Sequence, residues 1–323
     1  MTEHREVVDE RRPPEGETGG GAPVTVAGSA PATPAAPARR RPAAGPGPAR
    51  VRALPSVTTV IVAASAYLVA FVFVFPYLVM ILTALRPQEE LRQATFLPTT
   101  FAWSNFTNFW TGGLAQNLGV TLQVAAGSTV LVLLVALPAA YYTARHAFRG
   151  RTAFLVLVLI TQMFQPTAML VGIYREFFQL GLVDTVWSLI LVNGGFNLAF
   201  AVWILNAYFS SIPRELEEAA FIDGNGRFGA LFRVTLPLAM PGVVTALIFT
   251  FIAAWNEFVV ALTLTTTPSG QPLTVALNSF IGQYQVDWQN LFAGSVIATI
   301  PVIILFALIE RKVVGGLTAG SIK

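Results

Sequence analysis

The chain has 323 residues, of which 54% are apolar and only 11% are charged, with a formal net charge of +3. A soluble domain carries about 25% charged residues, so this composition excludes a water-soluble globule of this length. There is no cysteine, and His4 and His146 are the only histidines. Neither a disulfide framework, a thiolate or imidazole metal cluster, nor a serine–histidine–aspartate triad is therefore expected.

Residues 1–55 are rich in proline, alanine, glycine and arginine and have almost no large apolar side chains. Such a segment buries too little surface to offset the entropy of ordering, so we expect a disordered cytoplasmic tail. The first apolar run begins near Val57, later than in a secretory signal, so we expect the tail to be retained. Its arginines at 39–41 suit attraction to anionic lipid; the alternative is an inert solvated extension.

Residues 56–323 form the membrane body. A spanning helix needs ~20 mostly apolar residues. Six stretches have that length: 57–85, 117–144, 152–174, 186–209, 243–263 and 291–309. Backbone groups in hydrocarbon must bond within their own segment, so the sequence predicts an all-α bundle of six transmembrane helices. Kinks are expected at four prolines: Pro76, Pro138, Pro166 and Pro301.

The distribution of positive charge predicts the orientation in the membrane. Of the 20 Lys and Arg residues, only Arg86, Arg92 and Arg175 fall on the side opposite to the tail. The positive-inside rule therefore indicates a multi-pass protein of the cytoplasmic membrane with both termini in the cytoplasm.

The loop between the fourth and fifth spans, about 210–242, predicts a short helix on the cytoplasmic side. Ser211 suits the N-cap, Pro213 the first turn, and the acidic residues at 215–218 the positive end of the helix dipole. The run 223–226, Asp-Gly-Asn-Gly, should end this helix, and a second helix should run from about 227 to 236 and stop at Pro237.

Three small or apolar residues of the first short helix share one face. Leu216, Ala219 and Ala220 are spaced i, i+3 and i+4 on a helix that is otherwise charged. This face suits close docking to a protein at the membrane surface. The alternative is an amphipathic helix lying on lipid, but the acidic start of the helix would be repelled by an anionic leaflet.

A spacing pattern in this loop resembles a known family. Glu218-Ala219-Ala220, three residues, Gly224, nine residues and then Val234-Thr235-Leu236-Pro237 is similar to the EAA loop of ABC-importer permeases. Further segments resemble the MalG-like branch of carbohydrate permeases over about residues 56–323: 97–98 with 103–106, 145–151, 255–258 and 316–320.

The resemblance implies a mechanical role rather than an enzymatic one. In that family the EAA loop is a coupling helix that inserts into a cleft of a cytoplasmic ATPase. We assign this role to Glu218, Ala219, Ala220, Asp223 and Gly224. The implied partners are two ATPase subunits, a sister permease subunit, an extracytoplasmic solute-binding protein and membrane lipid, without nucleic acid. No phosphate-binding G-x-x-x-x-G-K-[ST] loop occurs, so ATP should be bound by the partner and no cofactor by this chain.

Polar residues inside the spans predict a solute path. An intramembrane carboxylate such as Glu257 is costly unless it faces water or a partner. Amides and aromatic faces suit a neutral polyhydroxylated solute. The predicted lining is Gln162, Gln165, Asn193, Asn197, Trp255, Asn256 and Glu257. The alternatives are interhelical hydrogen bonds and, for Glu257, a structural buttress.

Other functional classes fit the sequence less well. A proton-coupled secondary transporter should show internal repeats and several buried titratable groups, and a membrane enzyme should show a nucleophile with a nearby base. Neither pattern is evident. The resemblance implies a sugar or oligosaccharide as solute, with a glycerophosphodiester, a polyol or another small solute as alternatives.

The predicted topology can be tested by cysteine labelling, because the chain has no native cysteine. In sealed cells, a membrane-impermeant maleimide should label Glu89→Cys, since it lies outside, and should leave Asn225→Cys unlabelled, since it lies inside. Permeabilised cells, in which both positions should react, provide the control. Labelling of Asn225→Cys in sealed cells would contradict the orientation.

Overall fold

The computed structural model describes residues 57–92 and 97–318. For Arg92 and residues 310–318 it describes the backbone only. The predicted tail, 1–55, and the last two residues of the 316–320 segment lie outside the described residues. The helices are α1 (Val57–Ala84), η1 (Glu90–Arg92), α2 (Ser104–Thr111), α3 (Leu114–Arg145), α4 (Arg151–Thr161), α5 (Pro166–Gln179), α6 (Val186–Ser211), α7 (Glu215–Ile222), α8 (Arg227–Ala230), η2 (Leu231–Thr235), α9 (Leu236–Leu238), α10 (Met240–Trp255), α11 (Val259–Leu264), η3 (Pro268–Gly270), α12 (Leu273–Asn278) and α13 (Trp288–Thr318).

The all-helical prediction is confirmed for the described residues, which contain one isolated β-bridge between Ile281 and Val286 and no named strand. Within residues 57–92 and 97–318, four helices are long and apolar enough to cross a membrane: α1, α3, α6 and the 288–309 part of α13. Up to six spans result if each of two bent helix pairs counts as one span. Pro76, Pro138 and Pro301 lie inside α1, α3 and α13.

The third predicted span, 152–174, is not one straight helix. It consists of α4 and α5, which are bent by 92° at residues 162–165. Pro166 is the first residue of α5, and Gln165 before it is extended, with φ −71° and ψ 129°. Proline has no N–H and disfavours helical backbone in the preceding residue, so the chain turns here instead of kinking gently.

The fifth predicted span, 243–263, is also interrupted, and here the prediction of one continuous helix is wrong. Helix α10 ends at Trp255 and α11 begins at Val259. The Glu257 carboxylate accepts hydrogen bonds from the N–H groups of Val260 (2.7 Å) and Ala261 (2.9 Å). A side chain that satisfies the first N–H groups of a helix starts that helix anew, so Glu257 separates the two helices.

The second short helix of the 210–242 loop does not stop at Pro237 as predicted. The helical segment runs from Arg227 to Leu238 and then bends by 75° into α10. Pro237 follows the π-helical turn Leu231–Thr235, and the helix ends one residue after this proline, at Leu238.

Helices α3 and α6 pack closely because small residues face each other. A Cβ atom added at Gly127 would lie 2.6 Å from the Ile190 Cδ1 atom, and one at Gly194 would lie 2.9 Å from the Leu131 Cδ2 atom. Small residues let helix backbones approach closely in a membrane, where packing drives association. The core cluster on this contact includes Ala136, Ala140, Ala144, Ala201, Val202 and Leu205.

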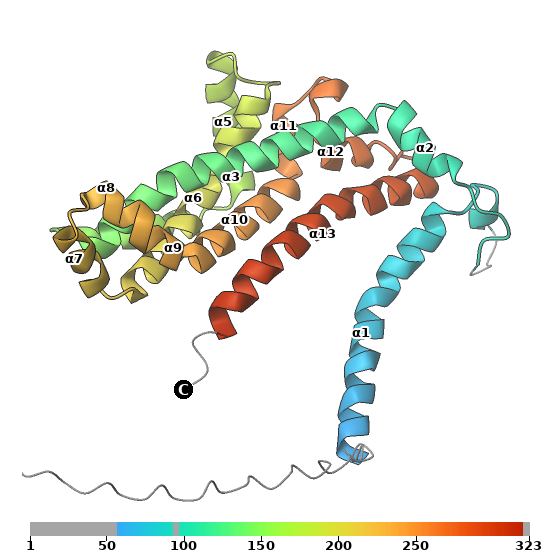
Figure 1. Cartoon of the computed structure of the whole chain (residues 1–323). Helices are drawn as coiled ribbons and strands as arrows, with labels where there is room; N and C mark the ends of the chain where they lie inside the picture. The colour runs from blue at the N-terminus through green and yellow to red at the C-terminus, as the bar shows by residue number, and fades with distance from the viewer. Residues whose placement is uncertain (1–56, 93–96, 319–323) are drawn as a thin grey trace, which may run out of the picture. The chain divides into compact units, whose positions relative to one another are not determined.

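One end of α3 carries α2 and α12, and the other end carries α7, α8 and α9 (Figure 1). At the first end, the Asn117 amide donates to two carbonyls of the loop 265–272, at 2.8 and 2.7 Å. The Asp184 carboxylate accepts from the Thr267 hydroxyl and from the N–H groups of Thr267 and Thr266. These bonds lower the pKa of Asp184 to about 2, so it stays ionised near neutral pH. The loops predicted to face outward thus gather at one end.

Candidate functional site

Helix α7 presents an exposed face away from the membrane helices. Glu218, Ala219, Asp223 and Gly224 are exposed, whereas Ala220 is buried. Four of the five predicted coupling residues therefore lie on one accessible surface, which we call the coupling surface. Ala220 instead packs against the protein's own interior.

Large apolar side chains are also exposed here, and of these only Leu216 was singled out from the sequence. Ile222 is 87% exposed and Phe228 is 79% exposed, and Leu216 and Phe221 are also exposed. The available signal was the apolar residues at 221, 222 and 228 in a loop that has many charged residues. An exposed apolar group rimmed by charged residues is typical of a protein contact.

The end of α7 has the conformation predicted for Gly224. Its φ is +84°, in the left-handed region that favours glycine, and its N–H donates to the Phe221 carbonyl. The start of α7 differs from the prediction. Ser211 is the last residue of α6, where its hydroxyl donates to the Tyr208 carbonyl, and Arg214 occupies the N-cap of α7.

A buried ion pair holds α7 to the membrane helices. The Arg145 Nε atom, at the end of α3, lies 2.7 Å from Glu217 Oε1, and the two side chains are only 6% and 8% exposed. Glu217 also accepts from the hydroxyls of Thr235 (2.6 Å) and Tyr141 (3.2 Å), and Arg145 Nη1 donates to the Ile212 carbonyl (2.9 Å). Glu217 therefore joins α3, α7 and η2.

Glu217 was not among the predicted site residues. Its neighbour Glu218 is exposed. Both are acidic residues in the first turn of α7, so the sequence pattern alone does not distinguish the buried one from the exposed one. The available signal was the spacing of 217 and 220, which places Glu217 on the same face as buried Ala220.

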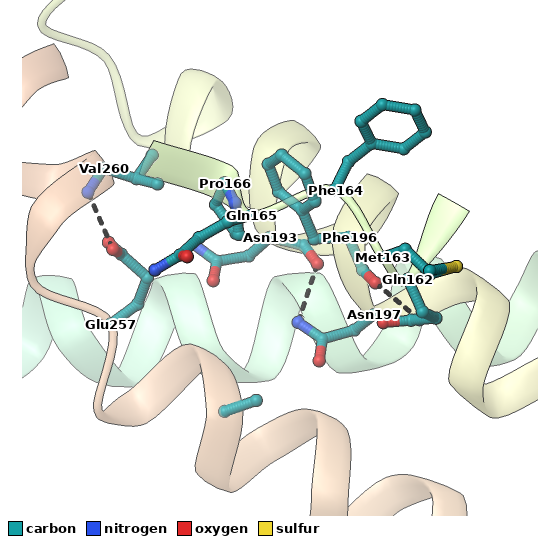
Figure 2. A pocket seen from close by; sticks show the side chains of 11 residues that line it. Gln162, Met163, Phe164, Gln165, Pro166, Asn193, Phe196, Asn197, Glu257 and Val260 are labelled. Carbon is teal, nitrogen blue, oxygen red and sulfur yellow. Dashed lines mark hydrogen bonds between the residues drawn. The ribbon is translucent and has the colours of Figure 1, made fainter. Parts of the chain in front are cut away.

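A second site lies where the two helix breaks meet α6. A pocket of about 510 Å³ opens between the 162–165 break, the 256–258 break and the middle of α6 (Figure 2). It is lined by Gln162, Met163, Phe164, Gln165, Pro166, Asn193, Phe196, Asn197, Ala253, Glu257 and Val260. Non-helical backbone at membrane depth is tolerated where it lines a cavity, which is the situation here.

Five of the seven residues predicted to line a solute path lie around this pocket: Gln162, Gln165, Asn193, Asn197 and Glu257. The other two do not line it. Trp255 is buried and stacks on Phe251 with ring centroids 5.5 Å apart, and the exposed Asn256, directly after α10, donates to the Ile252 carbonyl of that helix. Ending α10 at Trp255 turns both side chains away from the pocket.

Three of the pocket amides donate hydrogen bonds to nearby backbone carbonyls. Asn197 donates to the Asn193 carbonyl (2.8 Å), Asn193 to the Leu189 carbonyl (3.0 Å), and Gln162 to the Phe196 carbonyl (3.1 Å), as Figure 2 shows for the first and third. These bonds fix the orientation of the amides. The described residues contain no group of three His, Cys, Asp or Glu side chains that could hold a metal ion.

The Glu217–Arg145 pair can be tested by a double-mutant cycle. Glu217→Leu should lower the melting temperature of the solubilised protein strongly, because it leaves Arg145 buried and unpaired, at a cost of about 3–5 kcal/mol. Adding Arg145→Met should restore much of that loss, because both buried charges are then removed. Glu218→Leu, the same change at an exposed neighbour, should leave the melting temperature nearly unchanged. A double mutant as unstable as the sum of the two single mutants would show that the pair is not coupled.

The chain matches known proteins over most of its length. Residues 129–314 match the family described as "Binding-protein-dependent transport system inner membrane component". The probable ABC transporter permease protein YurM of Bacillus subtilis is 34% identical over 258 residues, which cover 80% of this chain and 85% of the relative. The sulfoquinovosyl glycerol transport system permease protein SmoH of Agrobacterium fabrum is 35% identical, covering 77% and 88%. The trehalose transport system permease protein SugB of Mycobacterium tuberculosis is 32% identical, covering 77% and 92%.

A solved structure shows the same fold. A bacterial ABC transporter involved in the import of the acidic polysaccharide alginate contains a chain that matches with a TM-score of 0.69 and 23% identity, covering 79% of this chain and 96% of that chain. With its apolar spans, its helical bundle and these relatives, the chain belongs to the inner membrane components of binding-protein-dependent transport systems, the permease family of ABC importers.

Proposed function

We propose that this chain is the permease subunit of an ATP-driven importer that carries a sugar or oligosaccharide across the cytoplasmic membrane. The observation that carries the proposal is the coupling surface on α7, which is exposed on one side and tied by Glu217 to the membrane helices on the other. Such a helix can receive force from a cytoplasmic partner and pass it to α3. Both termini are proposed to be cytoplasmic.

The energy source in this proposal is ATP bound and hydrolysed by separate subunits. Two cytoplasmic ATPase subunits dock on the coupling surfaces of this chain and of a sister permease, and an extracytoplasmic binding protein delivers the solute. The chain then has a transport role rather than an enzymatic one, and it binds no cofactor itself. The exposed apolar residues Ile222 and Phe228 support docking of a protein, because a monomer gains nothing from exposing them to water.

The proposed solute class follows from the pocket and from the relatives. The pocket amides at 162, 165, 193 and 197 match the hydroxyl groups of a neutral sugar, and Phe164 and Phe196 offer apolar faces for the ring. Relatives are named for transport of trehalose, sulfoquinovosyl glycerol and diacetylchitobiose. Glu257 is proposed to be a positioning residue here, because backbone N–H groups already hold both of its oxygens.

The coupling role predicts the effect of Gly224→Asp. The change adds bulk, charge and about 1–2 kcal/mol of backbone strain at an exposed, left-handed position while the membrane helices stay intact. The complex should insert normally, lose co-purification with the ATPase, and lose stimulation of ATP hydrolysis by the loaded binding protein. Gly226→Asp is the control, because it adds the same charge at the N-cap of α8, with φ −72°, where aspartate is favourable. If Gly224→Asp kept wild-type assembly and stimulated ATPase activity, the coupling role would be wrong.

The solute path predicts a difference between two asparagines. Asn197 and Asn256 both donate to a carbonyl four residues earlier, but only Asn197 lines the pocket. Asn197→Leu should lower initial uptake of the transported sugar about tenfold, since a hydroxyl in the pocket loses its partner. Asn256→Leu should transport nearly as the wild type does. The assay is uptake of radiolabelled trehalose or diacetylchitobiose by cells that express the whole transporter, and equal uptake by both variants contradicts the proposed path.

A further inference from the structure

A small polar cavity of about 210 Å³ lies beside the coupling surface, where the end of α3, helix α7 and the start of α8 meet. It is distinct from the membrane pocket and was not part of the sequence predictions. Its lining residues are Tyr141, Arg145, His146, Arg214, Glu217, Glu218, Phe221 and Arg227. The volume suits one side chain and is below the roughly 300–1,000 Å³ of pockets that hold small molecules.

One wall of this cavity contains a buried nitrogen without a hydrogen-bond partner. The Arg145 side chain is 6% exposed; its Nε is paired with Glu217 and its Nη1 with the Ile212 carbonyl. Its Nη2 is buried and has no acceptor. Buried donors are nearly always paired in folded proteins, so this nitrogen lacks an acceptor that an assembly partner can supply.

The cavity lining has one more positively charged side chain than negatively charged ones. Three arginines, at 145, 214 and 227, face two glutamates, at 217 and 218. Arg214 and Arg227 are exposed, so an incoming group can reach them from solution. A guanidinium prefers a carboxylate or a phosphate as its planar partner. The site is therefore complementary to a single acidic side chain.

We propose that this cavity receives one aspartate or glutamate side chain from the surface of the ATPase subunit that docks on α7. The inference rests on the proposed function, and it adds a defined ionic contact to the apolar contacts of Phe221, Ile222 and Phe228. The position supports it, because Glu218 and Phe221 belong both to the cavity wall and to the coupling surface.

A lipid headgroup is a poorer occupant of the same cavity. Glu218 is part of its wall, and the exposed carboxylates of Glu215 and Asp223 lie at the start and directly after the end of the same short helix. These carboxylates would repel the many negative charges of an anionic leaflet. A folded partner can instead place one carboxylate next to the arginines and away from the acidic side chains. The observations thus favour a protein partner.

The test measures binding of the ATPase subunits to the permease pair in nanodiscs of neutral phosphatidylcholine. Arg214→Glu and Arg227→Glu should each raise the dissociation constant at least about tenfold, because each places a repelling charge in the cavity wall. The wild type should lose affinity with rising salt more steeply than either variant does. The control is Arg233→Glu, since Arg233 is exposed on the same loop, bonds to Asn225 and does not line the cavity. Its dissociation constant should stay within about twofold of the wild-type value.

A charge-swap scan identifies the partner group. Exposed acidic residues of the ATPase are changed to lysine one at a time in combination with Arg214→Glu. Restoration of wild-type affinity by one of these changes supports the proposal, and failure of every one overturns it. It is also overturned if Arg214→Glu and Arg227→Glu bind as the wild type does, or if their defect appears only in nanodiscs that contain anionic phosphatidylglycerol, since the occupant is then a lipid headgroup.

The outcomes separate this inference from the proposed function. If the wild-type permease does not bind the ATPase, or if Gly224→Asp binds as well as the wild type, the proposed function fails and the inference fails with it. If the wild type binds, Gly224→Asp does not, and the arginine variants bind normally, the coupling role stands and the acidic contact alone is wrong.

Discussion

Helices α3 and α6 pack closely, and both the pocket and the coupling surface are attached to this pair of helices. Gly127 and Gly194 let the two backbones approach, and Asn206 adds a hydrogen bond to Thr143 across the contact, at 2.7 Å. In hydrocarbon, helices gain little from hiding apolar surface, so small residues and buried polar contacts hold them together. The pocket and the coupling surface are both built on this pair: Asn193 and Asn197 project from α6, and Arg145 ends α3.

The pocket exists because two neighbouring spans are interrupted at the same level. An interruption in a membrane is costly unless its backbone groups find partners, and both interruptions provide them. After α4, the N–H groups of Gln162 and Met163 bond to carbonyls three residues earlier. After α10, the Glu257 carboxylate holds the first N–H groups of α11, and the Thr274 hydroxyl donates to the Glu257 carbonyl at 2.8 Å. The carboxylate that looked like a solute contact thus stabilises the shape of the pocket.

The same two helices give a physical connection from the coupling surface to the pocket. The stretch of α6 from Asn197 to Ser211 is about 21 Å long at ~1.5 Å per residue, and α3 runs beside it to Arg145. At the α7 end of this pair, the buried Glu217–Arg145 ion pair holds α7 to α3, and breaking such a pair is costly because one charge is left without its partner. A displacement of α7 therefore moves α3 as well, and packing passes it on to α6.

The all-helical class, the positions of the apolar spans, the left-handed turn at Gly224 and the four exposed residues of the coupling set could all be predicted from the sequence. These follow from composition, hydrophobic length and glycine's freedom at positive φ, all of which are local properties. Three features could be seen only in the folded chain: Glu217 is buried while Glu218 is exposed, Trp255 and Asn256 do not line the pocket, and α10 ends before Glu257. These features depend on contacts between segments that are far apart in the sequence, such as the one between Arg145 and Glu217. Residue spacing within one segment does not predict such contacts.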